Sequence, residues 1–134
     1  MHRTACALVG ALVLVVGACS SKASPATSPP AMAAKQLVDD VAAGNFAEVT
    51  AHFDSKVAAN LSGTKLAQTW QDYQQAFGNY VSRGEPKEAK RGAITIEQVP
   101  VKMSKHKGEV RVSYNPDLTI AGLYFLKSGQ PLPP

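Results

Sequence analysis

Hydrophobic residues follow one period in the first half of the chain and another in the second half. Between residues 31 and 78 they recur at every third or fourth position, which is the spacing of one helix face. The residues of the clearest stripe are Leu66, Trp70, Tyr73 and Phe77. This stripe predicts a helix over residues 63–77 that ends at Gly78.

Shorter helices are predicted before this one. Leu37 and Val41 are four residues apart, and Gly44 follows them as a stop signal. Residues 46–53 repeat the helical spacing, and Asp54 is suited to cap one more short turn through its carboxylate. The first half of the chain is therefore predicted to be helical, with a hairpin of two helices around Gly44.

After residue 93 the hydrophobic period falls to two, as it does in strands. Ile94 and Ile96 alternate with polar residues, and the alternation resumes at Val99. The phase slips by one residue between Ile96 and Val99, which predicts a β-bulge or a bend, and Pro100 fits a bulge or a sheet edge. Residues 110–114 alternate again and predict another strand.

The last apolar run and one polar segment complete the predicted elements. Residues 120–126 are continuously apolar, which predicts a central strand, and residues 80–92 fit either a first strand or a long loop. Helices followed by antiparallel strands indicate an α+β fold. We expect N-terminal helices packed on a curved antiparallel sheet.

The N-terminus has the zones of a secretory signal peptide. Residues 1–4 carry one sure positive charge, and residues 5–18 are almost entirely Ala, Leu, Val and Gly, too short a core for a bilayer-spanning helix. The core ends in Val16-Gly17-Ala18-Cys19, which resembles the lipobox of bacterial lipoproteins. The resemblance implies lipidation of Cys19 and anchoring at the extracytoplasmic face of the cell membrane. Ordinary cleavage after Ala18, leaving Cys19 as a plain thiol, is the alternative.

Composition divides the chain into four parts. These are a signal peptide over residues 1–18, the lipidated cysteine with a disordered Ser/Pro-rich tether over 19–30, one α+β domain over 31–130 and a Pro-rich tail over 131–134. Cys6 would leave with the signal peptide and Cys19 would be acylated. The domain is therefore expected to have no disulfide and no thiol chemistry.

Charge is distributed unevenly over the predicted domain. Residues 31–78 hold three Lys against five Asp or Glu, whereas residues 79–134 hold nine Lys or Arg against five Asp or Glu. A basic second half could attract anionic headgroups, although lysines on exposed strands also protect sheet edges, which is the favoured interpretation. Aromatic residues do not interleave with the basic ones, so nucleic acid is not an expected partner.

Several short segments occur in a characteristic order and spacing. They are Gly44-Asn45-Phe46, Phe53-Asp54, Leu66, Trp70, Phe77-Gly78 and Ile120-Ala121-Gly122-Leu123. Over about residues 33–127 they resemble an uncharacterised bacterial domain with the cone-shaped, nuclear transport factor 2-like fold, found alone in lipoproteins or before secreted hydrolases. The turn at Asn115-Pro116-Asp117 departs from the usual Asp-Gly-Lys type. The signal peptide and the size also resemble actinobacterial, especially mycobacterial, lipoproteins.

Candidate chemistry is sparse. The sequence contains no His, Asp and Glu cluster at metal-ligand spacing, no Gly-rich phosphate loop and no nucleophile elbow, so we expect no metal, cofactor or catalytic residue. His52 is expected at the surface if Phe53 faces the core. The side chains that could line a pocket in the cone are Trp70, Tyr73, Phe77, Tyr114 and Tyr124, although a core position is the favoured interpretation for Trp70 and half-buried structural tyrosines are commoner.

Two functions remain compatible with the sequence. The first is a non-enzymatic module at the cell envelope that binds a protein partner or an apolar ligand through the concave sheet. The alternative is a small isomerase- or hydrolase-type enzyme that uses a pocket tyrosine with an Asp or His, which rests on fold analogy. A homodimer formed through the open sheet face is a further expectation.

Overall fold

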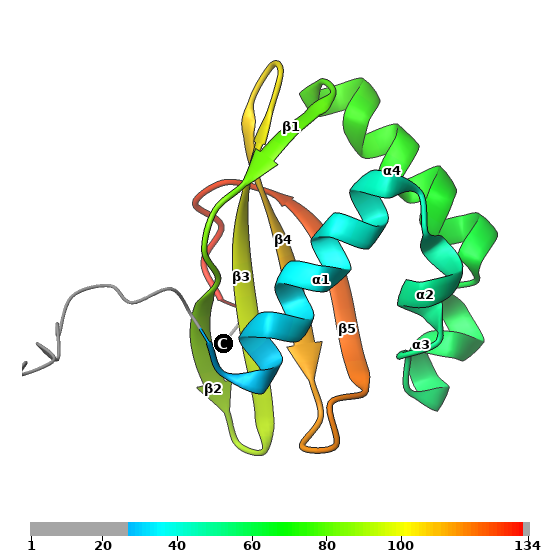
Figure 1. Cartoon of the computed structure of the whole chain (residues 1–134), viewed down its shortest axis with the longest axis vertical. Helices are drawn as coiled ribbons and strands as arrows, with labels where there is room; N and C mark the ends of the chain where they lie inside the picture. The colour runs from blue at the N-terminus through cyan, green and yellow to red at the C-terminus, as the bar shows by residue number, and fades with distance from the viewer. Residues whose placement is uncertain (1–26, 133–134) are drawn as a thin grey trace, which may run out of the picture.

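The computed structural model describes residues 27–132, in which four helices precede five strands. The elements are α1 Pro29–Ala43, α2 Phe46–Thr50, α3 Ser55–Asn60, α4 Gly63–Phe77, β1 Tyr80–Arg83, β2 Lys87–Arg91, β3 Ile94–Met103, β4 Lys107–Tyr114 and β5 Ile120–Lys127. The helices lie on one face of an antiparallel sheet (Figure 1), which confirms the predicted α+β fold. The predicted signal peptide, Cys19 and the tether up to residue 26 lie outside the described residues.

The first helix begins earlier than predicted. The Ser28 hydroxyl caps it by accepting a hydrogen bond from the Ala31 N–H at 3.3 Å. Pro29 and Pro30 occupy the first helical positions, where a missing N–H costs nothing because that group would have no intrahelical partner. Helix α1 therefore begins inside the segment 19–30 that the sequence predicts as a tether. Within the described residues, no helix is both long and apolar enough to cross a membrane.

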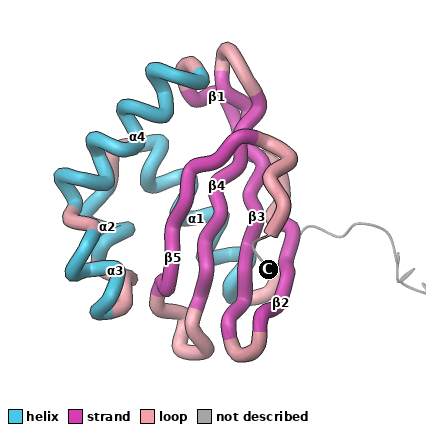
Figure 2. Tube along the Cα trace, turned by 180° about the vertical axis from the view of Figure 1, so that it is seen from behind, coloured by secondary structure: helices cyan, strands magenta, loops and turns pink. Residues whose placement is uncertain are grey.

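The sheet has the strand order β1-β3-β4-β5, and β2 also pairs with β3. β1 pairs with the Val101–Met103 end of β3, whereas β2 pairs with its Ile94–Gln98 end. The segment 80–92, which the sequence left open between strand and loop, thus forms two short strands that share one edge of the sheet. Figure 2 shows this edge from behind, with β2 beside β3.

The predicted bulge in β3 is wrong. The register of β3 against β4 is unbroken from the Thr95–Tyr114 pair to the Lys102–Lys107 pair. The residues of β3 that face the core are Thr95, Glu97, Val99, Val101 and Met103, and all are buried. The interruption in the hydrophobic alternation is a carboxylic acid, Glu97, at a core position.

The apolar run of β5 forms a sheet edge instead of the predicted central strand. Leu123 and Phe125 pack against the core, while Tyr124 between them is 55% exposed. The run is apolar because α4 covers the inner face of this edge, where the rings of Trp70 and Phe125 lie 5.3 Å apart.

The opposite face of the sheet is partly covered by the C-terminal residues. The buried Arg111 guanidinium donates hydrogen bonds to the Glu109 carboxylate at 2.7 Å, to the Gln130 carbonyl at 2.7 Å and to the Pro131 carbonyl at 3.1 Å. The predicted tail therefore starts as part of the fold, and its residues 133–134 lie outside the described range. Pairing of two copies through this face stays a prediction.

Candidate functional site

A cavity of about 280 Å³ lies between α1, α2 and the turn that joins β4 to β5. Its walls are mainly apolar, and four polar side chains join them. The lining residues are Ala33, Gln36, Leu37, Asp40, Val49, His52, Tyr114, Leu118 and Ile120. The four from α1 follow the i, i+3, i+4, i+7 spacing, which places them along one face of that helix.

Backbone hydrogen bonds hold the segment after α2 against the start of β5. The Ile120 N–H donates to the His52 carbonyl at 2.7 Å, and the Asp54 N–H donates to the Ile120 carbonyl at 2.9 Å. Phe53, between them, is buried. These contacts place the His52 backbone beside residues that are about 70 positions later in the chain, and the His52 side chain lines the cavity.

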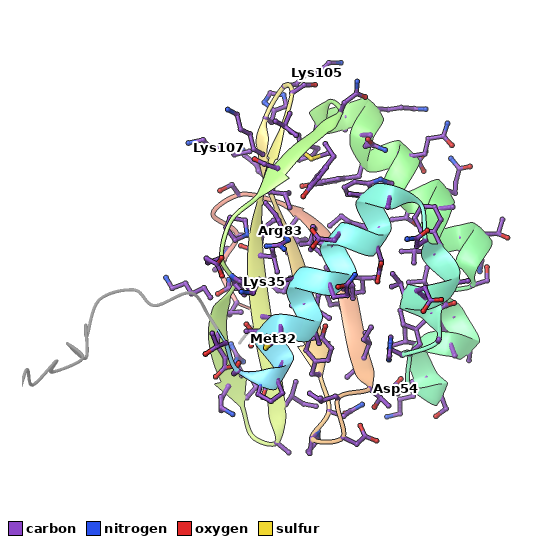
Figure 3. The ribbon with its side chains drawn as sticks, viewed as in Figure 1. Met32, Lys35, Asp54, Arg83, Lys105 and Lys107 are labelled. Carbon is purple, nitrogen blue, oxygen red and sulfur yellow. The ribbon has the colours of Figure 1, made fainter. Side chains whose placement is uncertain are left out.

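The turn between β4 and β5 is held by a side-chain network. The Asn115 amide donates to the Asp54 carboxylate at 3.0 Å and to the Thr119 hydroxyl at 2.9 Å, and that hydroxyl donates to Asp117 at 2.6 Å. Figure 3 shows Asp54 at this end of the molecule. The network holds Leu118 at a φ of 68°, a left-handed conformation that is costly for a branched residue. This strained residue forms part of the cavity wall.

The polar groups at the cavity can bind a ligand or exchange protons with it. Asp40 offers a carboxylate, His52 an imidazole and Tyr114 a hydroxyl, which together provide hydrogen-bond donors and acceptors. His52 is exposed, as predicted, yet it lies on the cavity rim. Within residues 27–132, no group of His, Cys, Asp and Glu could hold a metal ion.

Glu97 is the most unusual ionisable residue of the domain. Its side chain is fully buried, and no described group donates a hydrogen bond to either carboxylate oxygen. Burial raises the pKa of Glu97 to about 8, with a further contribution from Glu88, its cross-strand neighbour on β2. A protonated Glu97 can donate to the Glu88 carboxylate, whose pKa is lowered by that hydrogen bond and by one from Ser28. The neutral acid is therefore the form that the fold accommodates.

The buried acid lies electrostatically close to the cavity. Tyr114 is buried, and burial raises the pKa of its hydroxyl, with a smaller contribution from the charge of Glu97. Tyr114 thus has the cavity on one side and Glu97 within electrostatic range. Sequence reasoning missed Glu97, although its position in phase with Val99 and Val101 was a signal that could have identified it.

The five aromatic residues predicted to line one pocket lie in different places. Tyr114 lines the cavity, whereas Trp70 and Tyr73 are buried in an aromatic cluster beneath α4. Phe77 stacks on Tyr73 with ring centroids 4.5 Å apart. Tyr124 is exposed on the outer side of β5. The inner face of the sheet beneath α4 is therefore filled by the protein itself, and the cavity lies beside it.

Comparison with known families gives one match. A family model described as a protein of unknown function, DUF3887, matches residues 34–123. The chain belongs to this family. The matched region contains Glu97 and every cavity-lining residue except Ala33. No curated protein and no solved structure gives a match.

Proposed function

We propose that the chain is a lipid-anchored extracytoplasmic protein whose domain binds a small, largely apolar ligand in the cavity between α1, α2 and the β4–β5 turn. The cavity itself carries this proposal. Ligand pockets combine apolar walls with a few polar groups that orient the ligand, and this cavity has Gln36, Asp40, His52 and Tyr114 in that role. Its volume of about 280 Å³ suits a ligand at the small end of the usual range.

The proposed location rests on the N-terminal sequence. The segment Val16-Gly17-Ala18-Cys19 resembles a lipobox, and the likeness to cone-fold lipoproteins of actinobacteria supports the same assignment. A diacylglycerol on Cys19 supplies two acyl chains, which is enough for stable anchoring because each buried methylene contributes about 0.8 kcal/mol. The domain would then bind its ligand at the outer face of the membrane.

Replacing the predicted acylation site tests the anchor. We expect Cys19→Ala to abolish incorporation of labelled fatty acid. The variant protein should also move from the detergent phase to the aqueous phase when a cell extract is partitioned between the two. Cys6→Ala is the matched control, because that cysteine lies within the predicted signal peptide. Equal fatty-acid labelling of the Cys19→Ala variant and the unaltered protein would show that the anchor is not at Cys19.

Filling the cavity tests the binding function. Ala33→Phe adds a ring to the cavity wall and is expected to lower the occupancy of a co-purified envelope ligand at least about tenfold in native mass spectrometry. Ala43→Phe places the same ring on an exposed position of the same helix and should leave occupancy unchanged. A ligand retained equally by both variants would place binding elsewhere.

One observation favours a second function, a small hydrolase- or isomerase-type enzyme. Asp40, His52 and Tyr114 share the cavity, and such groups can act as general acids or bases. The two functions differ in the fate of the ligand. A bound molecule recovered with unchanged mass and connectivity after prolonged incubation favours binding, whereas its conversion, and loss of that conversion in His52→Gln, favours catalysis.

A further inference from the structure

Lysine side chains gather at the end of the sheet where the β3–β4 hairpin turns. The four lysines are Lys102, Lys105, Lys107 and Lys127. Lys105, Lys107 and Lys127 line a shallow hollow with His106, and Lys102 and Lys107 line the neighbouring one. Figure 3 shows Lys105 at the hairpin tip and Lys107 just below it, both projecting outward. We call this group of four lysines the cationic tip.

No described carboxylate neutralises the cationic tip. The ion pairs within residues 27–132 are Lys35–Glu85, Arg83–Asp39 and Arg111–Glu109, and none includes a tip lysine. Neither hollow has an Asp or Glu among its lining residues. The positive charges therefore reinforce one another and produce a local field that attracts anions.

The tip is held rigidly against the C-terminal end of α4. The backbone N–H groups of Lys105 and His106 both donate to the Phe77 carbonyl, at 2.9 and 3.2 Å. The Ser104 N–H donates to the Asn79 carbonyl, and the Ser104 hydroxyl accepts from the Asn79 N–H, each at 2.8 Å. The lysines consequently extend from a fixed surface, although each side chain can still move.

The chemistry of the tip suits an extended anionic surface. Lysine is a compact point charge on a flexible stem, whereas arginine is the residue that grips a single phosphate with two parallel hydrogen bonds. An exposed apolar residue, Val81, lies next to the tip at the bulge of β1, and it is 54% exposed. Several lysines beside an exposed apolar side chain form the composition that binds the headgroup region of a bilayer.

The position of the chain's N-terminal end points to the same partner. Ser28 donates a hydrogen bond to Glu88 of β2 at 2.8 Å, so the tether joins the domain at the sheet edge formed by β1 and β2. The tip lies at the β1 end of that edge, about 17–25 Å away along β3, because Glu88 pairs with Glu97 and the tip extends from Lys102 to the hairpin turn. Eight tether residues, 20–27, reach about 25 Å when extended. Both ends of this edge can therefore meet one membrane.

We infer that the cationic tip binds the anionic surface of a lipid bilayer. Contact at the tip, together with the tether at the β2 end of the same edge, places the domain edge-on against the membrane. The edge-on orientation rests on the proposed anchor at Cys19, whereas binding by the tip itself does not. Electrostatic attraction of this kind weakens as salt is added.

Vesicle binding by the chain from Ser20 onward, which keeps every described residue and has no acyl group, tests the inference. The probes are vesicles of phosphatidylcholine with and without phosphatidylglycerol. The tip variant carries Lys105→Gln and Lys107→Gln, and the control carries Lys56→Gln and Lys65→Gln on α3 and α4, which removes the same charge from exposed positions. We expect the tip variant to lose about twentyfold or more in affinity, at about fivefold per lysine, and the control to lose less than about twofold.

The outcomes separate this inference from its rivals. Salt-sensitive binding to phosphatidylglycerol vesicles that is lost in the tip variant and kept in the control supports it. An equal loss of affinity in both variants would mean that binding depends on net charge and not on the tip. Equal binding to vesicles of pure phosphatidylcholine would mean that binding does not depend on the charge of the lysines. Either result overturns the inference. Tip-dependent binding to soluble polyphosphate without vesicle binding overturns it as well. The Ala33→Phe variant should bind vesicles as the unaltered protein does. If the proposed ligand binding in the cavity proves wrong, the vesicle test of the cationic tip is therefore unaffected.

Discussion

The Glu97→Gln variant is expected to be about 3 kcal/mol more stable to unfolding than the unaltered protein at pH 7. Glutamine has nearly the same shape, so core packing is kept, and the penalty of burying an ionisable acid is removed. Glu97 has a pKa of about 8 in the fold and an ordinary value of 4.5 in the unfolded chain. At pH 7 the unfolded state is stabilised because Glu97 releases its proton there, whereas the folded state retains it. Each unit of difference between the two pKa values is worth about 1.4 kcal/mol.

The sign of the pH dependence follows from the same pKa values. The pKa of Glu97 is higher in the folded state than in the unfolded state. The contribution of Glu97 to the stability of the unaltered protein is therefore greatest below about pH 4.5, and this contribution is lost as the pH rises toward about 8. Denaturant unfolding across this range should show the advantage of Glu97→Gln growing with pH. Glu48→Gln, at an exposed position of α2, is the charge-matched control and should stay within about 0.5 kcal/mol. Parallel pH profiles for the Glu97→Gln variant and the unaltered protein would contradict the assignment.

The Gly108→Ala variant is expected to be about 2–4 kcal/mol less stable. A Cβ at this position of β4 would overlap the Tyr73 hydroxyl, which donates a hydrogen bond to the Leu126 carbonyl at 2.8 Å. Tyr73 is buried in the aromatic cluster, and burial raises the pKa of its hydroxyl to about 12. The ring must therefore shift within a packed core, or the hydrogen bond must break.

A double-mutant cycle identifies the cause of that loss. Tyr73→Phe removes the hydroxyl, so Gly108→Ala should cost at least about 1 kcal/mol less in a Tyr73→Phe background. Gly92→Ala is a useful comparison, because Gly92 has open space around it and a φ of 58°, so any cost there comes from the backbone alone. Additive losses in the Gly108 and Tyr73 cycle would show that the two residues do not clash.

The sequence predicted the helices well because their stripes and caps are local. Asp54 caps α3 through its carboxylate, which accepts a hydrogen bond from the Val57 N–H, Gly44 ends α1 in a left-handed conformation, and both lie where predicted. The strands were harder to predict because two different arrangements give the same pattern. A buried acid at position 97 interrupts the hydrophobic alternation just as a bulge does, and only the unbroken pairing with β4 distinguishes them.

The candidate site was predictable only in part. Tyr114 was among the residues that could line a pocket, and it lines this cavity, but Asp40 and His52 come from separate segments that meet it through long-range contacts. The hydrogen bond from the Ile120 N–H to the His52 carbonyl, which aligns α2 with β5, depends on no local signal in the sequence. Trp70 and Tyr73 lie in the core, which was the favoured interpretation for Trp70, because an aromatic stripe on a helix can either fill a core or line a pocket.

The most direct test of the central claim is a titration of the isotope-labelled domain with 1-octanol, a small apolar molecule with one hydroxyl, followed by amide chemical shifts. We expect saturable shifts at cavity residues such as Val49, His52 and Leu118, with none at Trp70 or Phe125. Those shifts should be absent from Ala33→Phe and present in Ala43→Phe. Saturable shifts that persist in Ala33→Phe, or no saturable shift in the unaltered domain, would contradict the assignment of a ligand-binding cavity.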